Sequence, residues 1–130
     1  MSSETLHEDA RTLGPQITDT HRAIVSLMEE MEAVDWYNQR AKATTHPELR
    51  AILEHNRDEE KEHAAMVLEW LRRNDPKLDE HLKTYLFTEG AVTEIEAKAA
   101  HGSGSGEGVE SSGDGSLGIG SLRPSAGAPK

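Results

Sequence analysis

Two long stretches with apolar residues at helical spacing, separated by a short break, constrain the fold of this chain most. The first runs from about Gln16 to Ala43 and the second from about Pro47 to Arg73. In both, apolar residues recur at intervals of three and four, which predicts amphipathic helices. The break, Thr44-Thr45-His46-Pro47, is so short that the two helices should form an antiparallel hairpin. Because no segment alternates with period two, we expect an all-α fold.

The helical signal is weaker beyond the hairpin. We expect a third helical segment at about Lys77 to Phe87, which Gly90 interrupts, and a short C-terminal helix at about Ala91 to Ala100. Two helices of the hairpin's length cannot cover both of their apolar faces alone. The chain should therefore be half of a four-helix bundle that dimerisation completes.

Composition divides the chain into three regions. The N-terminus is polar, and nine of the eleven glycines lie at or beyond Gly102, a composition that cannot bury a core. We expect a flexible N-terminus over residues 1–14, a helical domain over residues 15–100 and a disordered Gly/Ser-rich tail over residues 101–130.

The formal net charge of −10 and the absence of cysteine exclude several classes of function. An acidic surface repels nucleic acid and anionic lipid but concentrates cations. Without cysteine there are no disulfides and no thiolate metal sites. No apolar run approaches the roughly 18 residues that span a membrane, and the first residues lack the order of a signal peptide. We expect a cytoplasmic protein that binds neither nucleic acid nor membrane.

The second long segment carries a carboxylate and an imidazole on its apolar stripe. The stripe consists of Leu49, Leu53, Asn56, Glu60, His63, Val67 and Trp70, in alternating steps of four and three. An unpaired carboxylate in a core costs several kcal/mol or becomes neutral, so Glu60 needs a partner. One alternative is that His63 is a core histidine satisfied by Glu59, one turn earlier.

The first long segment supplies a matching acid, Glu30, on its own apolar stripe. The turn is centred near Thr45, fifteen residues after Glu30 and fifteen before Glu60, so an antiparallel hairpin places the two glutamates at one level. One Glu facing Glu-x-x-His is half of a dinuclear carboxylate site, and a two-fold dimer would supply the other half. Four carboxylates would then balance two divalent cations.

Oxygen and nitrogen ligands without sulfur suit iron or manganese, with zinc as a competitor. Tyr37 lies two turns from Glu30 on the same stripe and either contacts the ligands or fills the bundle core. Glu29 and Glu32 flank Glu30 as solvated charges or as an acidic rim that guides cations inward. Trp36 and Trp70 are more typical of packing or interface anchors than of ligands.

Three runs of sequence resemble one protein family. These are MEEMEAVDWYNQR, ELRAILEHNRDEEKEHAAMVLEWLRRNDP and HLKTYLFTEG, within residues 21–90. They resemble the encapsulated ferritins, cargo proteins of bacterial encapsulin nanocompartments, whose fold is a helical hairpin that dimerisation completes to a ferritin-like four-helix bundle. The resemblance implies a cytoplasmic protein enclosed in the nanocompartment.

The resemblance also implies an activity and its residues. The expected enzyme is a ferroxidase that oxidises Fe(II) with oxygen at a di-iron site between two chains, within a ring-shaped homodecamer of five dimers. Glu30, Glu60 and His63 correspond to the iron ligands and Tyr37 to a residue near the centre. Glu29 and Glu32 correspond to secondary metal sites on the path by which iron enters, and Trp36 lies beside them. Calcium, zinc or manganese are possible substitutes for iron.

The tail has a resemblance of its own. Residues 117–123, Leu-Gly-Ile-Gly-Ser-Leu-Arg, resemble the encapsulation peptide that docks cargo on the encapsulin shell protein. Leu117, Ile119 and Leu122 would make the apolar contacts, since spaced glycines let an extended segment approach a surface closely.

Two further hypotheses compete with a ferroxidase that supplies iron for mineralisation inside the shell. In the first, zinc or calcium at the same ligands locks a non-enzymatic helical scaffold. In the second, the chain is a plain dimerising helical module whose polar core sets register. Oxygen uptake on addition of Fe(II) separates the enzyme from both.

Overall fold

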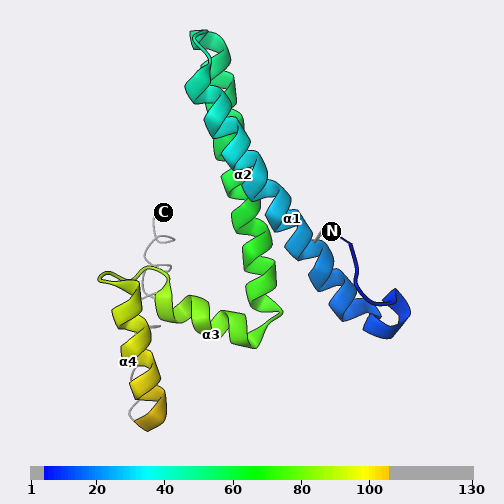
Figure 1. Ribbon diagram of the computed structural model, residues 1–130, viewed down its shortest axis with the longest axis vertical. Coiled ribbons are helices and arrows are strands. Elements are labelled where there is room, and N and C mark those ends of the chain that lie inside the picture. The colour runs from blue at the N-terminus through cyan, green and yellow to red at the C-terminus, as the bar shows by residue number, and fades with distance from the viewer. Residues whose placement is uncertain (1–4, 106–130) are drawn as a thin grey trace, which may run out of the picture. The chain divides into compact units, whose positions relative to one another are not determined.

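The computed structural model describes residues 5–105, which contain α-helices and no strand, as an all-α fold requires. The chain forms two compact units, divided after Pro76, and each is described by itself. In chain order the helices are α1 (Ala10–Ala43), α2 (Pro47–Arg73), α3 (Pro76–Tyr85) and α4 (Val92–Ser105) (Figure 1). No helix within the described range is long and apolar enough to cross a membrane.

The first helix begins earlier than the expected start near Gln16. Asp9 caps the helix, and its carboxylate accepts a hydrogen bond of 2.8 Å from the backbone N–H of Arg11. One short turn later Gly14 leaves the helical conformation with φ 84°, a value that favours glycine. The helix resumes at Pro15, and the Thr18 hydroxyl donates to the Gly14 carbonyl at 2.6 Å. Gly14 therefore marks a kink within α1.

The turn between α1 and α2 is held by side chains from both sides. Pro47 occupies the first turn of α2, and His46 caps that helix through Nδ1, which accepts from the Leu49 N–H at 3.5 Å. Arg50 reaches back from α2 and donates to the Ala41 carbonyl at 3.0 Å and to the Thr44 carbonyl. Arg50 thus satisfies carbonyls that the end of α1 leaves without helical partners.

The antiparallel α1–α2 hairpin confirms the predicted fold, and α2 has the predicted bounds (Figure 1). The buried apolar residues of the described chain are Ala41 on α1 and Ala64 and Leu71 on α2. A polar contact also joins the helices, because Arg57 Nη1 donates to Asn38 Oδ1 at 3.0 Å.

A single hairpin leaves much of its apolar surface uncovered. Large apolar side chains that remain exposed on α1 and α2 are Ile17, Ile24, Met28, Met31, Trp36, Leu49, Ile52, Met66 and Trp70. Monomeric soluble proteins rarely expose so many on two neighbouring elements, and such surfaces mark interaction sites. The described hairpin has the surface expected of half a bundle.

The second unit contains two short helices. Helix α3 ends at Tyr85, shortly before Phe87, a non-glycine residue with φ 62° whose surface is 90% exposed. The Thr88 hydroxyl donates to the Tyr85 carbonyl at 2.6 Å and satisfies one of the last carbonyls of α3. Helix α4 follows Gly90 and ends at Ser105, beyond the Ala100 expected from sequence.

Two neighbouring arginines near the end of α2, Arg72 and Arg73, both bind the carboxylate of Glu69. Arg72 donates to both oxygens of Glu69 at 2.8 and 2.7 Å, and Arg73 donates to one of them at 2.6 Å. The hydrogen bonds from Arg72, and then those from Arg73, lower the pKa of Glu69 from 4.5 to about 2.

Glu69 should therefore contribute a pH-dependent stability. Its folded-state pKa lies below its unfolded value, so the contribution is present above about pH 5 and is lost as the pH falls towards about 2. In urea unfolding, Glu69→Gln should be less stable than wild type at neutral pH, and the difference should shrink by about pH 3. Glu62→Gln, the same change at an exposed position of α2, serves as the control. A difference independent of pH would contradict the assignment.

Candidate metal centre

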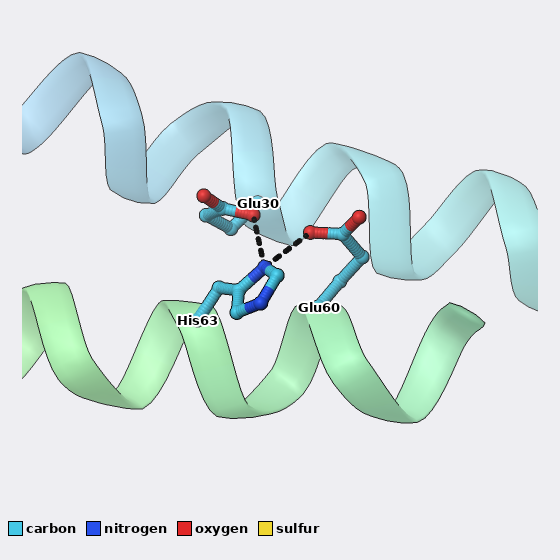
Figure 2. A group of neighbouring side chains, drawn as sticks. All are labelled: Glu30, Glu60 and His63. Atoms are coloured by element: carbon cyan, nitrogen blue, oxygen red, sulfur yellow. Dashed lines mark hydrogen bonds and ion pairs between the residues drawn. The ribbon is translucent and has the colours of Figure 1, made fainter. Parts of the chain in front are cut away.

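Three side chains from the two facing helices meet near the middle of the hairpin. Glu30 comes from α1, and Glu60 and His63 come from α2 (Figure 2). The Nδ1 atom of His63 lies 3.2 Å from Glu60 Oε1 and 3.6 Å from Glu30 Oε1. One potential ligand atom from each of the three residues lies within 4.8 Å of the others.

The length of the turn and the helical repeat together bring these three side chains close to one another. Glu60 and His63 are three residues apart, so they lie on one face of α2. The short turn fixes the register of the antiparallel helices, and Glu30 is as far before Thr45 as Glu60 is after it. The sequence therefore predicted that the two carboxylates lie at one level, and Figure 2 shows them on either side of the His63 ring nitrogen.

The three groups perturb one another's protonation. A hydrogen bond to Glu60, followed by burial, raises the pKa of Glu30. The same hydrogen bond is the largest cause that lowers the pKa of Glu60. The hydrogen bond that His63 Nδ1 donates to Glu60 also raises the pKa of His63. Glu30 thus binds a proton more tightly than an isolated carboxyl and Glu60 less tightly, and a bound cation would compete with protons at this cluster.

The cluster is partly accessible to solvent. The side chains of Glu30 and Glu60 are 26% and 23% exposed, and that of His63 is 45% exposed. Two carboxylate oxygens and one imidazole nitrogen fit the donor preferences of iron, manganese and zinc. Three ligands leave positions open for further ligands, for a second metal or for oxygen.

The other predicted site residues lie outside this three-residue cluster. Glu29 and Glu32 are exposed on α1. Tyr37 is half-buried and Trp36 is exposed, and both rings contact one guanidinium: Arg40 Cζ lies 5.7 Å from the Trp36 centroid and 5.6 Å from that of Tyr37. Leu117, Ile119 and Leu122 lie outside the described residues.

Sequence reasoning missed the contact of Arg40 with both rings and underused Glu59. Arg40 follows Trp36 by four residues and Tyr37 by three, a spacing that predicts neighbours on a helix surface. Glu59 entered only as an alternative partner of His63, whereas the structure places Glu59 and Glu60 at different nitrogens of the same ring. Helical spacing could have found both contacts.

Comparison with known proteins decides the family. A family model described as EncFtn-like matches residues 5–89. The chain belongs to the EncFtn-like family. Among curated EncFtn-like relatives, the chain is 63% identical over 129 residues to the encapsulated ferritin-like protein of Rhodospirillum rubrum, covering 96% of this chain and 92% of the relative. This membership confirms the resemblance noted in the sequence.

Two further proteins are also similar to this chain. The encapsulin nanocompartment cargo protein EncC of Myxococcus xanthus is 36% identical over 96 residues, which are 67% of this chain and 74% of that protein. The crystal structure of protein ne0167 from Nitrosomonas europaea is 59% identical, with a TM-score of 0.65 over 67% of this chain and 96% of that one. An experimental structure thus resembles this chain over about two thirds of its length.

Proposed function

We propose that this EncFtn-like chain is a ferroxidase that oxidises Fe(II) to Fe(III) with oxygen. The observation that carries the proposal is the convergence of Glu30, Glu60 and His63 from two facing helices. Two carboxylates from facing helices lie beside one imidazole, and the neighbouring Glu60 raises the pKa of Glu30. This arrangement favours a site that takes up a cation.

The complete site requires a second copy of the chain. A dinuclear carboxylate site of a four-helix bundle uses one Glu from each of two helices and Glu-x-x-His from each of the other two. One hairpin supplies half of that set, and the open side of the cluster leaves room for the other half. Apolar side chains left exposed on the same hairpin support a self-association that would bury them.

The chain's own residues would hold the substrate and tune its environment. Bound iron would supply the electrons that reduce oxygen. Glu30, Glu60 and their partner copies would balance the charge of two ferrous ions and, with His63, fix their positions. Glu29 and Glu32 would attract Fe(II) at the exposed surface near the site, with Trp36 beside them. Tyr37 would lie close to the centre in the assembled dimer.

The proposal also covers the oligomer that the chain forms and the compartment in which it lies. Five dimers would form a ring-shaped decamer, and residues 117–123 would dock it inside an encapsulin shell in the cytoplasm. The names of the relatives from Rhodospirillum rubrum and Myxococcus xanthus support this destination. An open ring encloses no cavity, so iron storage as mineral would depend on the shell.

Aerobic addition of Fe(II) to the purified protein tests the proposal. Fe(III) absorbance should rise much faster than in buffer alone, with matching oxygen consumption, and molecular mass should be followed alongside. Anaerobic addition provides the control and should give no rise. Assembly without oxygen uptake would instead favour the scaffold, in which zinc or calcium only locks the oligomer.

A further inference from the structure

The end of the hairpin that carries the turn is basic, although the chain as a whole is acidic. From Arg40 to Arg57 the sequence has four arginines or lysines and two glutamates, whereas the whole chain has 14 basic and 24 acidic residues. This stretch contains the end of α1, the turn and the first half of α2 (Figure 1). Four positive and two negative charges give it a formal charge of +2, so the rest of the chain carries −12 of the total of −10.

An open pocket lies beside the turn, and three of these four cations line it. The pocket has a volume of about 380 Å³ and is lined by Asn38, Ala41, Lys42, Arg50, Glu54 and Arg57. We call it the turn pocket. Because one water molecule occupies about 30 Å³ of the liquid, the turn pocket has room for a small ion together with part of its hydration shell.

Two of the three cations in the turn pocket have no acidic partner on the chain. Arg57 is paired, since its Nε lies 3.0 Å from Asp58 Oδ1. Within residues 5–105, neither Lys42 nor Arg50 has a carboxylate oxygen within 4.0 Å. The other basic residues of that range pair with carboxylates, except for Arg40 and Lys98. In a chain with a surplus of carboxylates, unpaired cations around one pocket favour an anion from outside the chain.

The two arginines of the turn pocket are held in place by contacts that use only part of each guanidinium. Arg50 donates from Nε to the Ala41 carbonyl at 3.0 Å and from Nη2 to the Thr44 carbonyl. Arg57 donates from Nη1 to Asn38 Oδ1 at 3.0 Å and from Nε to its acidic partner. A guanidinium has five N–H groups, so each arginine keeps three that make no described contact. Arg50 also covers carbonyls at the end of α1 that would otherwise repel an anion.

We propose that the turn pocket binds a small oxyanion of the phosphate type. Arg50 and Arg57 offer rigid, planar sets of N–H donors that match the oxygens of such an ion, and Lys42 adds a flexible positive charge. Glu54 also lines the turn pocket and opposes the anion, since no basic nitrogen of the described chain lies within 4.0 Å of its carboxylate. The proposed reaction uses none of these residues, so the inference goes beyond the ferroxidase.

A titration of the metal-free, full-length protein with inorganic phosphate gives the first test. Removal of metal ensures that phosphate does not bind through iron. At constant ionic strength, phosphate should change the ³¹P resonance and raise Tm, because a ligand of the folded state stabilises it, whereas chloride should not. Lys42→Ala should weaken phosphate binding about twofold to fivefold, the range that one exposed ion pair contributes. Lys98→Ala removes another exposed and unpaired lysine, on α4, and should leave the affinity unchanged.

A substitution that strengthens binding gives the second test. Glu54→Gln removes the opposing charge from the lining of the turn pocket and keeps the size of the side chain. It should tighten phosphate binding about twofold or more, by the same exposed-charge magnitude. Glu62→Gln makes the same change on α2 away from the turn pocket and should have no effect. Loss of fold cannot produce a gain in affinity, so this variant separates a binding role from a structural one.

The outcomes decide between an anion site and a contact between copies. Absence of phosphate binding by wild type, or equal effects of Lys42→Ala and Lys98→Ala, would overturn the proposal. So would a Lys42→Ala variant with reduced molecular mass and unchanged phosphate binding, since a carboxylate of another copy would then occupy the turn pocket. Failure of wild type to oxidise Fe(II) would refute the ferroxidase and leave the result of the metal-free titration standing.

Discussion

If the chain is the proposed ferroxidase, replacing any one of Glu30, Glu60 or His63 with alanine should abolish most of its Fe(II) oxidation. Loss of an outer partner of a ligand costs roughly 10–100-fold in affinity or activity. Loss of a ligand itself should therefore lower the initial rate by more than about a hundredfold. Each substitution acts twice in a two-fold dimer, since both halves of the site lose the same ligand. The measurement is the initial rise of Fe(III) absorbance in air at equal protein concentration.

The controls for this series separate metal binding from folding. The three side chains are 23–45% exposed on the single chain, so their truncation should leave the helical hairpin intact. Far-UV circular dichroism and molecular mass should therefore match wild type in metal-free solution. Glu62→Ala removes an acidic charge close to the site without removing a ligand and should keep the wild-type rate. Wild-type rates in all three alanine variants would show that oxidation occurs elsewhere.

The part of the site that depends on helical repeat and turn length could be predicted from the sequence. A four-residue break fixes the register of two long helices, so the level at which Glu30 meets Glu60 follows from counting residues on each side of Thr45. The Glu60–His63 pair follows from the helical repeat alone. These local constraints are strong because an α-helix fixes the direction of every side chain along it.

Features set by a balance of small energies could not be predicted in the same way. The first helix was expected to start near Gln16, yet the Asp9 cap stabilises one more short turn before Gly14 and Pro15. Helix α4 continues into glycine-containing sequence, where helix propensity predicts an earlier end. The proposed place of Tyr37 near the metal site would depend on a second chain, because on a single hairpin the described contact of its ring is with Arg40. Its role therefore stays a prediction.

Exposed apolar side chains on the metal-site side of α2 predict how the second chain binds. Met66 and Trp70 follow His63 by three and seven residues, so the three lie along one face of the helix. Met66 is 63% exposed. It lines an open, largely apolar groove of about 330 Å³ that also includes Ala23 and Val67. A partner chain that completes the metal site would have to cover this neighbouring surface as well.

Met66→Asp should therefore prevent assembly and, with it, Fe(II) oxidation. On an isolated hairpin the change costs little, because the side chain is exposed, but in an interface a carboxylate without a partner costs several kcal/mol. Size-exclusion chromatography with light scattering should show the mass falling towards that of one chain, with a parallel loss of Fe(III) formation. Met66→Leu, which conserves volume and apolar character, should keep both. If Met66→Asp instead retained full mass and rate, the partner would have to cover a different face, and the proposed pairing of half-sites across this surface would be wrong.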